Sequence, residues 1–210
     1  MNRDKYQTKE KDKFEKRVNT SDIEVRKEED GSKKLIGYAV RWDKLSDEIG
    51  YYYTFREKFE RGAFKNSLAK EEQKAHYNHD TSIMLGRTKN GTLKLEEDEK
   101  GLRFEVDLPD TTDGNDLHAL VKRGDIDGVS FGFLPEVEEI DEKDPENVIR
   151  TVKEARLFEI SPTPYPAYSQ TSVQARSLTG YEKNKIKEKQ IERQNKLDAN
   201  KIKNKFTGVI

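Results

Sequence analysis

The chain has 210 residues, of which 32% are hydrophobic and 39% are charged, and its formal net charge is −1 at pH 7. So small an apolar fraction predicts one compact core with solvated extensions. The sequence contains no cysteine, which excludes disulfides, thiol nucleophiles and cysteine-based zinc sites, and fits a reducing compartment.

The charges are unevenly distributed along the chain. Residues 181–210 carry nine basic and four acidic groups, whereas the middle of the chain is acidic. An acidic middle is a poor partner for nucleic acid, because binding phosphates requires clustered Lys and Arg. The first residues, MNRDKYQTKEKDKFEKR, lack an apolar segment, and no run is long enough to cross a bilayer. We therefore expect neither a secretory signal nor a membrane partner.

The composition divides the chain into three zones. Residues 1–20 are charged and nearly featureless, and we expect a mobile arm there. Residues 21–178 hold the strand-like patterns and all six prolines, which predicts the folded domain. Residues 179–210 are rich in Lys, Glu and Gln, and their apolar positions follow neither a heptad nor a steady helical period. We expect a charged tail that is helical or disordered.

The first half of the domain is mostly strand-like. Residues 35–42 (LIGYAVRW) are rich in apolar and aromatic residues and predict a strand. Residues 57–70 place apolar side chains at helical spacing and predict an amphipathic helix. Residues 91–109 alternate between apolar and polar on both sides of a polar turn, which predicts a β-hairpin.

The second half adds one clear helix and two strands. Residues 113–123 place three apolar side chains on one helical face, with Lys122 and Arg123 in the last turn and Gly124 as the stop signal. Residues 128–133 and 156–162 predict two more strands. Many strands and few helices indicate a mainly β (α+β) fold, an antiparallel β-barrel, closed or nearly closed, with a few surrounding helices.

The stretch DIDGVSFGF, residues 125–133, contains a candidate nucleophile. Because successive side chains on a strand point to opposite faces, one face is apolar and the other carries a hydroxyl between glycines. The apolar face consists of Val129, Phe131 and Phe133, and the other of Gly128, Ser130 and Gly132. The glycines would leave room for a substrate backbone beside Ser130. They would equally ease a bend or a close strand crossing.

A nucleophilic serine needs a base, and the chain has three histidines. Neutral imidazole suits this role near pH 7 because an unperturbed imidazole has a pKa of about 6.5. His118 falls at the polar edge of the predicted helix, where we expect a surface residue. Strand alternation over 75–88 would group His79 with Tyr77, and His76 with the opposite face. The competing interpretation is a metal site built on His76 and His79.

The base is usually oriented by a third group, and Glu159 is the candidate. It stands inside an otherwise apolar strand, where an unpaired carboxylate is costly to bury. The alternative is an ion pair with Arg156 or with an arginine of another strand. Asp80 is a rival orienter, although neighbours on a strand point apart, so its position beside His79 disfavours it.

These segments together resemble the prohead (capsid maturation) serine proteases of tailed bacteriophages, the HK97 type. The resemblance runs from about Leu35 to Ser177, and the order and spacing of the segments are more specific than any one of them. They are IGYAVRW, ERGAFKNSL, HYNHD followed by LGRT, GTLKLEEDEKGLRFEVDLPDT, LVKRGDIDGVSFGF and LFEISPTPYPAY.

The resemblance implies a fold like that of herpesvirus assemblin, a small β-barrel serine protease. It places the nucleophile at Ser130, the base at His79 and the third member at Glu159, with no cofactor and no metal. Backbone N–H groups would form the oxyanion hole, and Arg87 is a candidate for a supporting role. The N-terminal arm, residues 1–20, and the tail after Ser177 match no pattern of the family.

The resemblance further implies the substrates, partners and location. They are scaffold protein, major capsid protein and the protease's own ends, cleaved inside the immature phage capsid in the bacterial cytoplasm. We expect self-cleavage between about residues 170 and 185. Assemblin-type relatives are dimers, and the helix at 114–123 is a candidate dimer contact. The alternatives are a non-catalytic scaffolding or capsid-binding module, and a metal-dependent hydrolase that uses His76, His79 and Asp80.

Overall fold

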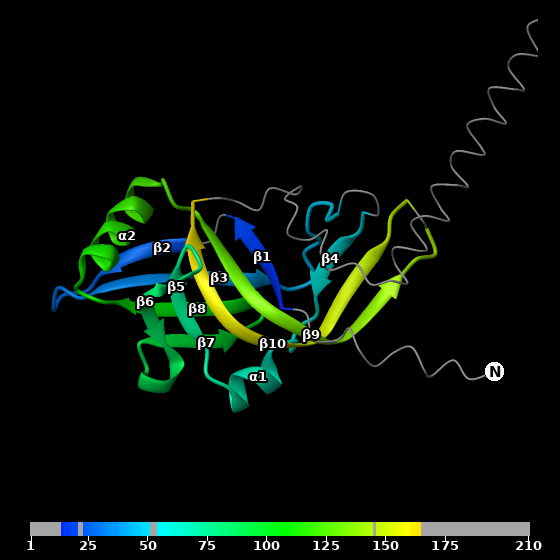
Figure 1. The fold of residues 1–210 in the computed structure, drawn as a ribbon, viewed down its shortest axis with the longest axis horizontal. Coiled ribbons are helices and arrows are strands. Elements are labelled where there is room, and N and C mark those ends of the chain that lie inside the picture. Colours follow the sequence, from blue (N-terminus) through cyan, green and yellow to red (C-terminus); the bar gives the residue numbers. More distant parts are fainter. Residues whose placement is uncertain (1–13, 21–22, 51–53, 145, 165–210) are drawn as a thin grey trace, which may run out of the picture.

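The computed structural model describes residues 14–20, 23–50, 54–144 and 146–164. Within them the chain is mainly β with two α-helices (Figure 1). The strands are β1 (Glu15–Thr20), β2 (Ile23–Lys27), β3 (Lys33–Arg41), β4 (Arg56–Phe59), β5 (Lys74–Tyr77), β6 (Asp80–Arg87), β7 (Leu93–Glu97), β8 (Gly101–Leu108), β9 (Gly128–Asp141) and β10 (Ile149–Thr163). The helices are α1 (Lys65–Lys70), α2 (Thr112–Arg123) and the short 3₁₀ helix η2 (Thr88–Asn90). The expected tail at 179–210 lies outside the described residues.

The described strands form two sheets. The larger has the order β1-β9-β10-β5-β6, with β4 also pairing with β10, and the smaller has the order β2-β3-β8-β7. The chain passes from β6 to β7 through η2 and Gly91, which turns in the left-handed region (φ 77°), and the two strands belong to different sheets. The expected single closed barrel is therefore wrong for the described strands. Nor is the pairing wholly antiparallel, because β4 and β5 run parallel to β10.

One hydrophobic core takes residues from both sheets and from α2, and Leu68 of α1 packs against it. An aromatic cluster within it anchors β9: Phe131 and Phe133 each lie within 5.5 Å of Phe59, measured between ring centroids, and Phe64 stacks on Phe59. Edge-to-face and offset ring pairs of this kind stabilise a fold by about 0.5–1.5 kcal/mol each beyond the area they bury. The first half of β9 is thereby held rigidly in the core.

Helix α2 confirms the helix expected at 113–123. Thr111 caps its N-terminus by accepting a hydrogen bond from the Gly114 N–H, and Gly124 ends it in the left-handed conformation. The helix lies against β2, β3 and β8. Neither described α-helix has the length and apolarity needed to cross a membrane.

The prediction of a helix over residues 57–70 is only half correct. Residues 56–59 form β4, which pairs with β10, and the helix begins only at Lys65. Gly62 between them has a φ of 94°, which interrupts any helix. The helical spacing of apolar residues arises because Phe59 and Phe64 reach the same core from a strand and from a turn.

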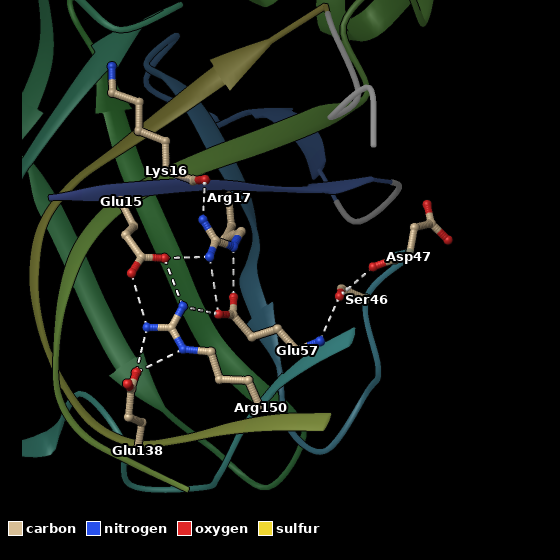
Figure 2. A network of polar contacts seen from close by, with 8 residues as sticks. All are labelled: Glu15, Lys16, Arg17, Ser46, Asp47, Glu57, Glu138 and Arg150. Atoms are coloured by element: carbon tan, nitrogen blue, oxygen red, sulfur yellow. Dashed lines mark hydrogen bonds and ion pairs between the residues drawn. The ribbon is translucent and has the colours of Figure 1, made fainter. Parts of the chain in front are cut away.

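Strand β1 lies inside the segment expected to be a mobile arm. It pairs with β9 from Glu15 opposite Phe133 to Thr20 opposite Gly128. Its inner side chains join an ion cluster of Glu15, Arg17, Glu57, Glu138 and Arg150 (Figure 2), called the buried ion cluster here because Glu57 and Arg150 at its centre are buried, although Glu138 at its edge is exposed. Arg17 donates to Glu57 at 2.8 Å, and Arg150 donates to Glu57 at 2.8 Å and to Glu15 at 2.9 Å. The cluster thus ties β1 to β4, β9 and β10.

Candidate active site

Ser130 lies in the buried half of β9, between β1 and β10. Val129, Phe131 and Phe133 face the core, so the predicted division of this strand into two faces is confirmed. Ser130 stands opposite Val18 of β1 and Ser161 of β10 and has no exposed surface. The strand therefore holds the hydroxyl in a fixed and enclosed position.

A β-bulge on β10 places Glu159 next to β9, the strand that carries Ser130. Leu157 pairs with Phe133 and Glu159 with Gly132, so Phe158 is the extra residue. Bulges change the direction of side chains and are frequent beside active sites. Here Leu157 and Ile160 both reach the core, while Glu159 points to the face that carries Ser130.

His79 does not lie on a strand. Tyr77 of β5 pairs with Asp80 of β6, so Asn78 and His79 are the two central residues of a tight hairpin turn. Both have positive φ values, 49° and 62°. The expected grouping of His79 with Tyr77 on one strand face is therefore wrong, because the strand ends before the histidine. The turn projects the imidazole over β9 and β10.

The three predicted catalytic side chains converge. His79 Nε2 lies 2.6 Å from Ser130 Oγ, and His79 Nδ1 lies 2.9 Å from Glu159 Oε1. A charged carboxylate can only accept hydrogen bonds, so the proton of a neutral imidazole belongs on Nδ1 and is donated to Glu159. That leaves the lone pair of Nε2 free to accept the Ser130 O–H. The tautomer is thus the one that a general base requires.

The carboxylate of Glu159 is held in its charged form. Burial disfavours that form, but the hydrogen bond from His79 and the positive charge of Lys16, 3.7 Å away, outweigh it, so the pKa of Glu159 lies below its ordinary value. Ser161 donates to the second carboxylate oxygen at 3.4 Å. Sequence reasoning missed both partners: Lys16 becomes a neighbour only through the pairing of β1 with β9, whereas Ser161 lies two residues along β10 and strand alternation could have found it.

The residues of the metal alternative do not form a site. Among the described residues there is no group of three or more side chains arranged to hold a metal ion. His76 is buried on β5, and its Nδ1 has no hydrogen-bond partner in the described part of the chain. Asp80 accepts from the backbone N–H and hydroxyl of Ser82. The rival role for Asp80 as orienter of His79 is therefore wrong, since Glu159 occupies that position.

Two other predicted residues have different partners. Arg156, the alternative partner of Glu159, instead donates to Glu71 at 2.7 Å. Arg87, the candidate for a supporting role at the oxyanion hole, is hydrogen-bonded to Glu72. His118 lies on α2 and is partly exposed, on an element that packs against the smaller sheet.

An imidazole hydrogen-bonded to a serine hydroxyl on one side and to a carboxylate on the other is the arrangement of a serine hydrolase. The family model described as "Caudovirus prohead serine protease" matches residues 21–186. The chain therefore belongs to the caudovirus prohead serine protease family, which confirms the resemblance found in the sequence.

Among solved structures, the capsid assembly protease gp21 of bacteriophage T4 is similar. The sequences are 10% identical, the match covers 71% of this chain and 95% of that chain, and the TM-score is 0.49. A comparison with the curated proteins gives no match.

Proposed function

We propose that the protein cleaves peptide bonds by acyl transfer with Ser130 as nucleophile, His79 as general base and Glu159 as the group that orients the base. The proposal rests on one observation. Two hydrogen bonds, of 2.6 Å and 2.9 Å, join opposite nitrogens of the His79 ring to Ser130 and Glu159. These three residues come from β9, a hairpin turn and β10, and misplacing any one of them would break the hydrogen-bonded chain that joins them.

The first half of the reaction forms an acyl-enzyme. Ser130 Oγ attacks the scissile carbonyl carbon while His79 Nε2 takes the hydroxyl proton. The resulting imidazolium is stabilised by Glu159 through Nδ1–H. Collapse of the tetrahedral intermediate breaks the C–N bond, and His79 gives its proton to the leaving amine. Water then attacks the ester with His79 again as base, which releases the carboxylic acid and restores Ser130.

Access to the nucleophile requires a local displacement. Ser130 is fully covered in this structure, so a substrate carbonyl reaches Oγ only after covering atoms move. His79 is the most exposed of the three, with 20% of its side-chain surface accessible. Entry from the side of the hairpin turn therefore needs the smallest displacement.

The family description supports the substrate class. A prohead protease acts on proteins of the assembling capsid, so the substrates are the major capsid protein and the scaffold protein. The reaction then takes place inside the immature capsid, in the host cytoplasm. The homodimer stays a prediction, which sedimentation of the purified chain tests.

Co-expression of the protein with its capsid and scaffold proteins tests the function. Wild type should shorten both substrates, whereas Ser130→Ala, His79→Ala and Glu159→Ala should leave them intact or nearly so. Ser46→Ala is the control for loss of a serine hydroxyl, because Ser46 accepts a hydrogen bond from the Glu57 backbone N–H and does not contact the triad. Intact processing by both Ser130→Ala and His79→Ala would show that the chain acts as a binding or scaffolding module instead.

Self-cleavage is a separate proposal, and the expected region at 170–185 lies outside the described residues. Mass spectrometry of the purified wild type should show a chain shortened in this region, while Ser130→Ala should stay at full length. Identical full-length masses for both proteins would contradict self-cleavage without affecting the proposed triad.

A further inference from the structure

The turn that carries His79 is conformationally unfavourable. A two-residue hairpin turn with positive φ at both positions is of type I′, which favours Asn first and Gly second. Asn78 fits the first position, but His79 stands where glycine is preferred. A left-handed conformation costs a residue with a Cβ about 1–2 kcal/mol. Residues held in this way at functional sites need support from the surrounding structure.

The strand ladders provide little of that support. The pairing of β5 with β10 joins Lys74 to Glu159 and Ala75 to Ile160, and so ends before Asn78. Pairing of β5 with β6 shows two register irregularities, on either side of His76. The tip of the hairpin therefore depends on other contacts for its position.

Two hydrogen bonds fasten the tip to the end of β10. The Asn78 backbone N–H donates to the Pro162 carbonyl at 3.0 Å, and the Thr163 hydroxyl donates to Asn78 Oδ1 at 3.0 Å. Thr163 is 3% exposed whereas Asn78 is an exposed residue, so the second bond is partly buried, on the side of Thr163. Breaking it would take a hydrogen-bond partner from the buried Thr163 hydroxyl, which is costly.

The same strand carries Glu159 and pairs with β9, the strand that carries Ser130. Glu159 is on β10, and the β10 register places Ser161 opposite Ser130 and Thr163 opposite Gly128. A hairpin tip fastened to Pro162 and Thr163 is thus fixed relative to both the carboxylate and the nucleophile. We propose that Asn78 and Thr163 are positioning residues for His79, joined by a side-chain bond that keeps the imidazole in reach of Ser130. This inference rests on the proposed function of the triad.

The test uses the full chain and a fluorescent fluorophosphonate, a reagent that reacts with activated serine hydroxyls. Thr163→Val removes the hydroxyl and keeps the shape, whereas Thr163→Ser keeps the hydroxyl. Asn78→Gly suits the left-handed backbone and removes only the acceptor side chain. Thr151→Val, farther along β10, is the matched control. The maximal labelling rate, the reagent concentration at half-maximal rate and the thermal midpoint are measured for each.

We expect Thr163→Val and Asn78→Gly each to lower the maximal labelling rate about 10–100-fold, because a displacement of about 1 Å costs roughly that much. The half-saturating concentration should change little, since the binding surface is retained. Thr163→Ser and Thr151→Val should label at close to the wild-type rate. The double variant Asn78→Gly with Thr163→Val should be no slower than the slower single variant, since both remove the same bond.

The outcomes separate this inference from the proposed function. Labelling that persists in Ser130→Ala overturns the triad. Labelling that is lost in Ser130→Ala but proceeds at the wild-type rate in Thr163→Val or Asn78→Gly overturns the positioning role alone. Equal loss in Thr163→Ser and Thr163→Val also overturns it, because the hydroxyl would then be irrelevant. If Thr163→Val does not fold, the maximal labelling rate of Asn78→Gly decides whether the positioning role holds.

Discussion

Glu159 on β10 lies directly opposite Gly132 on β9, and a Cβ at residue 132 would stand 3.0 Å from Glu159 Cγ. The same Cβ would meet the ring of Phe14 at 2.3 Å. The glycine two residues after Ser130 is therefore needed for space. It allows the carboxylate and the Phe14 ring to cross close to the β9 backbone.

Gly132→Ala should lower the catalytic rate more than the stability. Phe14 is half-exposed and can move aside, but Glu159 is held by His79 and Ser161, so the added methyl shifts the carboxylate. A shift of this kind costs about 10-fold or more in rate. Adding Phe14→Ala should restore the thermal midpoint without restoring labelling by the fluorophosphonate. Full recovery of labelling in the double variant would show that only the ring contact matters.

Glu159→Gln tests the orienting role without changing the size of the side chain. A glutamine amide can present its N–H to Nδ1, which favours the tautomer that has no lone pair on Nε2 to accept the serine proton. The corresponding change in a serine protease triad costs about 10⁴-fold in kcat, and we expect a loss of about 10³–10⁴-fold here. Peptide cleavage and the thermal midpoint are measured together. A loss below about 10-fold, in a folded variant, would assign the third role elsewhere.

Parts of the site were predictable from the sequence because they follow regular alternation. The faces of β9, which place Ser130 on one side and bury Phe131 on the other, follow from period two alone. The caps of α2 are similarly local signals. Glu159 was identifiable as an acid within an apolar strand.

Other parts depend on departures from regular structure. The bulge at Phe158 and the turn at Asn78 and His79 alter which way side chains point, and alternation cannot anticipate either. The Asn before His79 was an available turn signal. The sequence patterns did not predict strands β1 and β4, for a different reason. Their inner positions include charged residues, Arg17 and Glu57, which pair only after distant segments meet.

The left-handed turn predicts an unusual order of stability between two variants that both lack the imidazole. His79→Gly should be more stable than His79→Ala by about 1 kcal/mol, because glycine adopts a φ of 62° without the Cβ penalty. Both variants lose the hydrogen bonds to Ser130 and Glu159. The difference between their free energies of unfolding therefore reports the cost of the backbone conformation at residue 79. Urea unfolding at neutral pH measures the difference. Equal stability would mean that the turn relaxes when the imidazole is absent.

The buried ion cluster predicts a large effect far from the triad. Glu57 is 2% exposed and accepts hydrogen bonds from both Arg17 and Arg150. Glu57→Gln should therefore destabilise the fold by about 3–5 kcal/mol, because both arginines lose their most deeply buried carboxylate partner and keep only Glu15 and the more exposed Glu138. Glu139→Gln, which breaks an exposed pair with Lys153, is the matched control and should have no measurable effect. Similar losses in the two variants, measured by urea unfolding, would contradict the importance of the cluster.

The same cluster predicts how stability depends on acid. Burial raises the pKa of Glu15, but hydrogen bonds and charge from Arg150 and Arg17 outweigh it, so the pKa in the folded chain lies below the ordinary 4.5. A lowered pKa means that the folded state favours the carboxylate. Its stabilisation is complete above about pH 5 and is lost as the pH falls below 4.5 through the folded value. Glu15→Gln has no carboxylate to protonate.

The free energies of unfolding of wild type and Glu15→Gln, measured in urea from pH 7 to pH 3, should therefore converge. Wild type should be clearly more stable at pH 7, since Glu15→Gln leaves Arg150 short of a charged partner. The gap should narrow only below about pH 5, because the wild-type carboxyl then takes up its proton. Two curves that stay parallel down to pH 3 would show that Glu15 is not held in its charged form by the cluster.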